Sequence, residues 1–533
     1  MYYILHMNQA IISLFHTLFS YPQKCVDHIG MYRIVTLALL GLVLSSLIAG
    51  STSLLAYSPT TQLISLFIAV LIGLGLNLAL SRIWNIPTNH ESALITALIM
   101  FFLVIPSQNI IENWELAVGT GLAILSKYII TYNKQHIFNP AVFGTVSLAF
   151  GVFIYNILFG SSHPTDIFSW WIANPILLWP VLLFGVLIVF KIRKWQLVLS
   201  FFVAGLLVFL LESIHFGEPL LESAVIYLTS YPTLFLMFFM LTEPFTIPPT
   251  KRTQMVYGAL VGVLSSTALL ANIIPITPEL ALMIGSIFAY SFRIKQKLYL
   301  ELLEKKEIAE NTWEFIFKKP AHFNFKAGQY LEWMLPHAKP DNRGPRRYFT
   351  IASGPDEKNI RLALRVVPKN GSSYKKALMK LRPGETVIAS QLAGDFLLPK
   401  HSSTTNKLGF IAGGIGVTPF SSHLHDMTNQ EKPFDTVLYY CCEKKEELAY
   451  LQDFNSLDLP LEIIPVLKKG DVTQSEESGY ITAEILDKRT PDWKERTWYI
   501  SGPPAMVNAY TKLLLDLGMP HKKIKKDFFP GLA

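Results

Sequence analysis

The sequence is poor in cysteine and, over its first half, poor in charge. Its 533 residues include only three cysteines, Cys25, Cys441 and Cys442. Their spacing fits neither a zinc site nor an iron–sulfur cluster and provides no disulfide framework, so a thiol-reducing compartment is expected. Residues 1–292 hold only ten Lys+Arg and ten Asp+Glu. So little charge over that length excludes an ordinary soluble protein for this part.

Charge is concentrated instead after residue 292. The remaining residues carry 36 of the 46 basic and 29 of the 39 acidic side chains, so the net charge of +7 belongs to this half. A domain boundary is therefore expected near Arg293. A basic balance suits anionic cofactors or an anionic membrane face, and charge alone does not choose between them. No nucleic-acid partner is expected.

Long uncharged runs predict a polytopic membrane domain over residues 31–292, after a cytoplasmic segment at 1–30. No charged residue occurs from Ile34 to Ser81, which is enough for two spans of about 20 residues each. Similar runs follow. They predict about ten helices, centred near residues 44, 72, 98, 123, 150, 182, 204, 232, 264 and 284.

The loops between these helices alternate in charge. Basic residues follow the even-numbered helices at Arg82, at 127–134, at 191–194, at 251–252 and from Arg293, whereas acidic residues follow the odd-numbered ones. Short loops rich in Lys and Arg stay on the cytoplasmic side of a membrane. The pattern predicts a multi-pass protein of the cell membrane with both termini in the cytoplasm.

Three polar stretches interrupt the apolar half. They are residues 91–106 (ESALITALIMFFLVIP), 125–144 (LSKYIITYNKQHIFNPAVFG) and 241–258 (LTEPFTIPPTKRTQMVYG). Each alone is typical of loops and caps, although broken backbone at helix ends can also line a cavity. Together they resemble the NqrB/RnfD membrane protein family, which occurs in the sodium-translocating NADH:quinone reductase and in the Rnf complex, with Glu243 where that family usually shows Asp. The resemblance implies an electron-carrying membrane scaffold.

A covalent flavin is not expected in this scaffold. Members of the resembled family carry FMN on a threonine within a Ser/Thr-Gly-Ala-Thr motif, and this sequence has no such motif. The sequence leaves open whether the scaffold binds FMN without a covalent link.

The charged half divides into two expected domains. Residues 297–402 begin with alternating polar and apolar positions and a turn at Glu310-Asn311, which predicts an antiparallel β-barrel. Residues 403–533 alternate apolar strands with helices, which predicts a doubly wound α/β domain.

The segment RRYFTIAS suits a flavin dinucleotide. Arg347 can pair with a pyrophosphate, Tyr348 and Phe349 can pack on a flat ring, and Thr350 can donate a hydrogen bond near the reactive nitrogen. Downstream, LRVVPKNGSSY adds Arg365 and Val366, and then Gly371, Ser372 and Ser373 at the start of a predicted helix, where backbone N–H groups can meet phosphates.

Two further motifs complete the resemblance of residues 297–533 to the ferredoxin-NADP reductase superfamily. The turn GGIGVTPF offers Gly413, Gly414 and Gly416 for close backbone approach to a second dinucleotide, with Thr418 and Pro419 starting a helix. The segment SGPP holds Ser501, Gly502 and Pro503, with Ser501 where the family has a cysteine near nicotinamide C4. Relatives often end with an aromatic residue on the outer flavin face, and Phe528 is the candidate here.

These observations predict a membrane-bound oxidoreductase that passes electrons from NAD(P)H through FAD to a quinone, a flavin or a protein. Thr350 and Ser501 are the expected residues closest to the chemistry. A ferric reductase or NADPH oxidase relative is one alternative, but it needs haem-binding histidines within its helices, whereas His90, His136, His163 and His215 fall in loops or at a helix end. A redox-coupled ion transporter is the other, although no carboxylate falls in mid-span. The sequence does not decide between NADH and NADPH as the electron donor.

Overall fold

The computed structural model describes the chain in two units, residues 1–296 and 297–533. The described residues are 29–84, 89–132, 135–160, 169–244, 246–267, 277–292, 297–337, 340–341, 344–366, 371–399, 407–428, 434–469 and 473–528. The expected cytoplasmic segment at 1–30 lies almost entirely outside them. The division between the units lies close to the boundary expected near Arg293.

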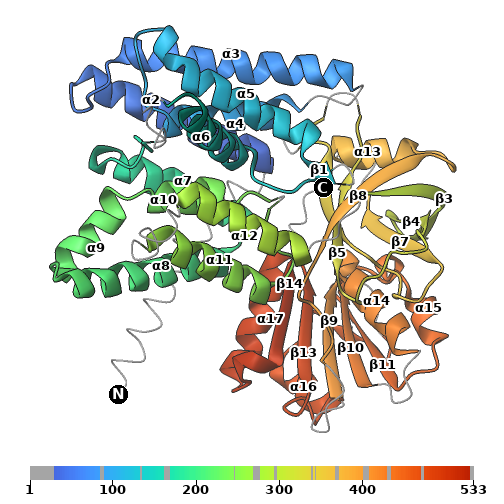
Figure 1. The fold of residues 1–533 in the computed structure, drawn as a ribbon. Helices are drawn as coiled ribbons and strands as arrows, with labels where there is room; N and C mark the ends of the chain where they lie inside the picture. The colour runs from blue at the N-terminus through green and yellow to red at the C-terminus, as the bar shows by residue number, and fades with distance from the viewer. Residues whose placement is uncertain are drawn as a thin grey trace. The chain divides into compact units, whose positions relative to one another are not determined.

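The first unit is helical (Figure 1). Its α-helices are α2 (Met31–Ser51), α3 (Pro59–Ile83), α4 (His90–Leu103), α5 (Trp114–Ile129), α6 (Pro140–Phe159), α7 (Leu178–Ile192), α8 (Trp195–Phe216), α9 (Leu220–Thr229), α10 (Thr233–Phe235), α11 (Lys251–Ser266) and α12 (Pro278–Phe292). A π-helical turn, η3 (Leu236–Met240), continues α10, and a short hairpin of β1 (Thr131–Tyr132) and β2 (Gln135–His136) follows α5.

Fewer helices than expected are long enough to cross a membrane. Among the described residues, five helices have the necessary length and apolar character, or six if α9 and the segment Thr233–Met240, bent by 52°, form one span. The expected ten spans are not confirmed, because helices such as α4, with 14 residues, reach only about 21 Å against a hydrocarbon core of about 30 Å. Large exposed side chains such as Leu44, Phe67 and Leu183 suit contact with lipid.

The second unit begins with a six-stranded antiparallel sheet. Its strands are β3 (Leu298–Ala309), β4 (Thr312–Lys318), β5 (Tyr330–Met334), β6 (Arg346–Thr350), β7 (Asn359–Arg365) and β8 (Thr386–Ala393), in the order β6-β5-β8-β3-β4-β7. The turn at Glu310-Asn311 joins β3 and β4 as expected, with Asn311 at φ 55°. Among the described strands, β6 and β7 form the two edges, so closure into a barrel is not confirmed. Helix α13 (Ser373–Lys380) precedes β8.

A six-stranded parallel sheet completes the unit. Its strands are β9 (Lys407–Gly413), β10 (Asp435–Cys442), β11 (Leu461–Leu467), β12 (Glu477–Ser478), β13 (Thr497–Gly502) and β14 (Ile524–Phe528), in the order β12-β11-β10-β9-β13-β14. Its α-helices are α14 (Thr418–Met427), α15 (Leu451–Asn455), α16 (Ala483–Arg489) and α17 (Pro504–Asp516). The order reverses between β9 and β13, which creates a switch point at their carboxyl ends.

Alternate residues of the parallel strands build a core on each face of this sheet. Phe410 and Tyr440 pack with α14 and α15 on one face, whereas Ile411 and Tyr439 pack with α16 and α17 on the other (Figure 1). Strands buried on both faces are the reason for the near-continuous apolar runs in the sequence. The doubly wound arrangement is therefore confirmed.

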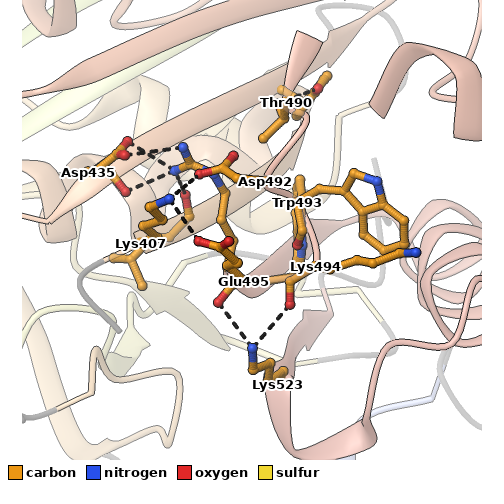
Figure 2. A network of polar contacts seen from close by, with 12 residues as sticks. Lys407, Asp435, Thr490, Asp492, Trp493, Lys494, Glu495 and Lys523 are labelled. Atoms are coloured by element: carbon orange, nitrogen blue, oxygen red, sulfur yellow. Dashed lines mark hydrogen bonds and ion pairs between the residues drawn. The ribbon is translucent and has the colours of Figure 1, made fainter. Parts of the chain in front are cut away.

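A polar network ties together the amino ends of β9, β10 and β13. Arg496, which is 8% exposed at its side chain, donates to the carbonyl oxygens of Leu408 and Asp435, each at 3.0 Å, and pairs with the carboxylates of Asp435 and Asp492. Lys407 reaches Asp492 at 2.8 Å, and Lys523 donates to the carbonyls of Lys494 and Glu495 (Figure 2). This edge is opposite the switch point, so it supports the fold rather than a site.

Replacing Arg496 tests that structural role. We expect Arg496→Met to destabilise the second unit by about 1–3 kcal/mol, because two buried carbonyl groups lose their donor. Hydrogen–deuterium exchange of the full chain should show lower protection of β9 and β13 amides. The exposed Lys512 on α17 provides the control Lys512→Met. Unchanged protection in Arg496→Met would show that the network contributes nothing to the stability of the second unit.

Candidate active site

The glycine turn joins β9 to α14 at the switch point. Gly414 has φ +52°, a conformation in which glycine is favoured. A Cβ on Gly416 would lie 2.6 Å from the Ser501 carbonyl oxygen and 2.7 Å from Gly502 Cα, both of them backbone atoms. Thr418 and Pro419 form the first turn of α14. The turn therefore packs directly on the end of β13, and the N-terminus of α14 opens beside it.

Ser501 and Gly502 end β13 at the same edge. Ser501 is fully buried, and its hydroxyl makes no hydrogen bond to the described residues. It pairs in register with Ala412 of β9 and Asp527 of β14. Pro503 caps α17. The predicted residues of both glycine-containing motifs are thus brought together, and the Ser501 hydroxyl, which has no hydrogen-bond partner among the described residues, lies at the same strand end.

Strand β6 separates the residues of the RRYFT segment onto two faces. Residues opposite one another in an antiparallel pair share a face, and successive residues alternate. Tyr348 lies opposite Glu332, whereas Phe349 lies opposite Leu331. Tyr348 and Phe349, both expected to pack on a flat ring, therefore point to opposite faces of the strand, because neighbouring residues of a strand point in opposite directions.

One face of β6 forms a cluster around Glu332. This carboxylate is buried and accepts hydrogen bonds from Arg346 at 3.0 Å, from Tyr348 at 3.0 Å and from Ser390 at 3.3 Å. The Tyr348 ring is 48% exposed and meets Tyr330 edge-on. Sequence reasoning missed Glu332, because a single carboxylate in an apolar strand is typical of an isolated surface residue.

The other face forms a cluster around Arg347. Its guanidinium donates to both carboxylate oxygens of Asp341, at 2.8 and 2.9 Å, and lies 5.3 Å from the ring centroid of Tyr374. Phe349 packs on the same ring at 5.8 Å. Tyr374 is fully buried, yet its hydroxyl makes no hydrogen bond to the described residues. The unsatisfied Tyr374 hydroxyl can donate to an anionic group, whereas the charge of Arg347 is already paired with Asp341.

The predicted helix after Gly371 is confirmed and begins beside Arg347. Ser372 caps α13 by accepting a hydrogen bond from the Lys375 N–H at 3.3 Å. Ser373 accepts one from the Asp341 N–H at 2.8 Å, so Asp341 links the helix start to Arg347. The positive end of α13 is thus adjacent to a basic side chain, as phosphate binding requires.

Arg365 and Val366 contact other parts of the second unit. Arg365 pairs with Glu447 at 2.7 Å, which joins the end of β7 to the parallel-sheet half. Val366 is 7% exposed, and its N–H donates to the Asn311 carbonyl. None of the described contacts connects either residue with the Arg347 cluster.

Thr350 and Ser501 lie on different sheets of the second unit. Thr350 is buried and lies opposite Tyr330 in the antiparallel sheet. Ser501 lies between Ala412 and Asp527 in the parallel sheet. None of the described contacts joins Thr350 with Ser501 directly. The backbone of Phe528 lies opposite Gly502, at the same strand end as Ser501.

Hydrogen bonds fix the two sheets of this unit against each other. Ser422 donates to the Ser353 carbonyl at 2.7 Å, and Tyr450 donates to Glu314 at 2.6 Å. Tyr499 donates to the Leu397 carbonyl at 2.7 Å. These contacts hold the two halves of the candidate site in register.

The helical unit contains a cavity of its own. Its volume is about 50 Å³, and it is lined mainly by apolar side chains, with Thr96, Asn139, Thr242 and Glu243 as polar groups. Glu243 pairs with His136 at 3.3 Å. All three polar stretches of the first unit therefore meet at this cavity. Glu212 and Glu279 are also buried in this unit, near the ends of α8 and α12.

Family comparisons match both units. Residues 410–512 match the oxidoreductase NAD-binding domain. Residues 172–294 match the NQR2, RnfD, RnfE family. The second unit thus carries an oxidoreductase NAD-binding domain, and the part of the first unit from residue 172 onward resembles the NQR2, RnfD, RnfE family.

Individual relatives resemble the second unit. The F component of the Na(+)-translocating NADH-quinone reductase of Actinobacillus succinogenes is 29% identical over 205 residues, 35% of this chain and 49% of the relative. Flavohemoprotein A of Dictyostelium discoideum is 24% identical over 243 residues, 43% of this chain and 59% of the relative. The chain thus spans half to three fifths of these relatives. A solved cytochrome P450 reductase of Amycolatopsis is similar with a TM-score of 0.40 and 24% identity, over 45% of this chain and 71% of that one.

Proposed function

We propose that this protein is a membrane-bound, FAD-dependent NAD(P)H oxidoreductase that delivers electrons to an acceptor at or in the membrane. The observation that supports the proposal most strongly is the packing of the glycine turn on the Ser501–Gly502 end of β13, at the switch point of the parallel sheet. Hydride transfer requires two rings held at about 3–3.5 Å, and a site between two fixed sheets can provide that.

The residues of the switch point would bind NAD(P)H. Gly413, Gly414 and Gly416 allow the pyrophosphate to approach the backbone, and the N-terminus of α14 faces its charge. Gly502 and Pro503 border the same opening, and the buried Ser501 hydroxyl would donate to or accept from the nicotinamide end. Ser501 stands where the resembled superfamily has a cysteine. It keeps a polar group at this position but lacks the sulfur atom.

The residues of β6 and α13 fit FAD. Arg347 and the first residues of α13, Gly371 to Ser373, would hold the pyrophosphate, with the Tyr374 hydroxyl as an additional donor. Tyr348 or Phe349 would cover the flavin ring, each from its own face of the strand. Thr350 would donate toward the reactive nitrogen. FAD held by these residues would supply hydride acceptance and one-electron release.

The helical unit is the proposed binding region of the electron acceptor. The cavity at Thr96, Asn139 and Glu243 has the mixed lining of a small-molecule site, but its volume of about 50 Å³ is too small for a flavin or quinone ring unless the lining helices move apart. FMN bound without a covalent link, or a quinone, would require that movement, and a protein acceptor would dock outside the cavity. A cytoplasmic position for the second unit, where NAD(P)H is present, agrees with the charge pattern of the loops.

Flavin extraction from the full-length protein in detergent tests the proposal. We expect a yellow protein that releases about one FAD per chain on denaturation and bleaches a soluble dye when NADH or NADPH is added. Chromatography that separates FAD from FMN would show whether a second flavin is present. A colourless protein that reduces no dye after incubation with FAD would refute the proposed function.

A further inference from the structure

Helix α14 joins the glycine turn to the antiparallel sheet. It begins directly after the turn, and in its second helical turn Ser422 donates to the Ser353 carbonyl at 2.7 Å. Ser353 follows Thr350, the last residue of β6, by three positions. Near its end the helix packs on the next residue, because a Cβ on Gly354 would lie 3.0 Å from His425 Cβ. The helix that starts at the glycine turn therefore also contacts the segment next to Thr350.

Arg361 of β7 fixes the same segment. Its N–H donates to Ser353 Oγ at 3.2 Å, and its carbonyl oxygen accepts a hydrogen bond from the Ala352 N–H at 2.9 Å. Its guanidinium donates to Glu357 Oε1 at 2.8 Å, and this oxygen also accepts a hydrogen bond from the Gly354 N–H at 2.6 Å. The backbone and the side chain of one residue therefore hold the segment that follows β6.

The Arg361 guanidinium also faces the parallel-sheet half. The side chain is 12% exposed, and the guanidinium lies 3.6 Å from Asp453 Oδ2 on α15 and 5.6 Å from the ring centroid of Tyr450. Asp453 Oδ2 in turn lies 3.4 Å from His425 Nε2, so Arg361 and α14 meet at one carboxylate. A second carboxylate, Glu314 of β4, lies 3.5 Å from Arg361 and accepts a hydrogen bond from the Tyr450 hydroxyl at 2.6 Å. Partly buried charge pairs resist separation, because moving one partner away leaves the other uncompensated.

We propose that Arg361 is a positioning residue for hydride transfer, which ties α14 to the segment after β6 and so sets the nicotinamide against the flavin. The inference rests on the proposed function, and Arg361 acts through these two elements rather than by contact with a dinucleotide. Hydride transfer needs reacting atoms about 3–3.5 Å apart, and a misplacement of about 1 Å can cost roughly 100-fold in rate. Binding depends on contacts spread along each dinucleotide, so a small shift at one end changes the affinity much less. Arg361 should therefore affect the rate of hydride transfer more than the affinity.

Arg361→Lys tests the inference in the full-length protein. Lysine keeps a positive charge beside Glu314, but it lacks the planar fork that reaches several carboxylates at once. We expect the limiting rate of flavin reduction by NADH or NADPH, measured by anaerobic stopped-flow absorbance, to fall about 10- to 100-fold. The half-saturating concentration of the dinucleotide and the flavin content should change by less than about 2-fold. The exposed Arg382 gives the matched control Arg382→Lys, which should behave as the wild type does.

His425→Gln tests the α14 side of the Asp453 contact by the same measurements. We expect the limiting rate to fall about 3- to 10-fold, because one of the contacts that hold α14 is lost. The double variant Arg361→Lys/His425→Gln should lose less than the product of the two separate losses, since both side chains act through Asp453. His425→Gln also decides the question by itself should Arg361→Lys not purify with its flavin.

The outcomes separate the positioning role from the proposed function. A limiting rate that neither variant changes, or a loss confined to dinucleotide affinity or flavin content, would overturn the positioning role. Reduction of the wild-type flavin would then leave the proposed function intact. A wild-type flavin that neither NADH nor NADPH reduces would overturn both.

Discussion

Gly416→Ala should lower kcat/KM for NAD(P)H by at least about 100-fold while the protein keeps its flavin. The added Cβ would lie 2.6 Å from the Ser501 carbonyl oxygen and 2.8 Å from the Gly502 nitrogen. Both contacts are with backbone, so the end of β13 or the glycine turn must shift. The FAD residues on β6 belong to the other sheet and should be unaffected.

Steady-state kinetics with a dye acceptor, together with the flavin-to-protein ratio, would measure this effect. Gly518→Asn is a suitable control, because Gly518 follows α17 with φ +90° and a Cβ there meets no atom within 4 Å, and asparagine tolerates such a conformation. Full activity in Gly416→Ala would mean that the end of β13 does not bind the nicotinamide dinucleotide.

Arg347→Ala should reduce the affinity for FAD by at least about 10-fold, since a charge-assisted pair with a phosphate is worth about 1.5–3 kcal/mol. The guanidinium is held by Asp341, by the Gly344 and Arg346 carbonyls and by the Tyr374 ring. Its position is therefore fixed before a ligand binds. Arg347→Lys should restore only part of the affinity, because lysine lacks the planar fork.

Flavin content after purification and titration of the apoprotein with FAD would give the two affinities. Arg382 is an exposed arginine of the same antiparallel half, and Arg382→Ala should bind FAD as the wild type does. If Arg347→Ala purified fully yellow with unchanged affinity, the pyrophosphate would have to bind elsewhere, and the Arg346–Glu332 face of β6 would be the next candidate.

Much of the second unit could be predicted from its sequence because the signals are local. Alternating polarity with a turn at Glu310-Asn311 specifies a hairpin, and the apolar runs of β9, β10 and β13 specify strands buried on both faces. The glycine turn is local too: Gly414 occupies a left-handed conformation, and Gly416 is packed against backbone. Such requirements restrict the amino acid at a single position, so one sequence is enough to recognise them.

Helix length was the weaker prediction, because hydropathy does not say where a helix stops. Pro140 starts α6 after Asn139, and Pro219 and Pro232 flank α9. These breaks divide continuous apolar sequence into segments, some of which are too short to cross a membrane alone. The break at Asn139 and Pro140 lies at the cavity where the three polar stretches meet, which composition could not indicate.

Local sequence was sufficient to predict the division into an apolar and a charged half, the two sheet types of the second unit and the motifs that point to two dinucleotides. Each of these features depends on residues close together along the chain. Other features emerged only from the folded chain: the opposite directions of Tyr348 and Phe349, and the ion pairs Arg347–Asp341, Arg365–Glu447 and Lys469–Glu443. Strand register and sheet packing bring these side chains together, and no local pattern encodes which distant carboxylate a given cation will meet.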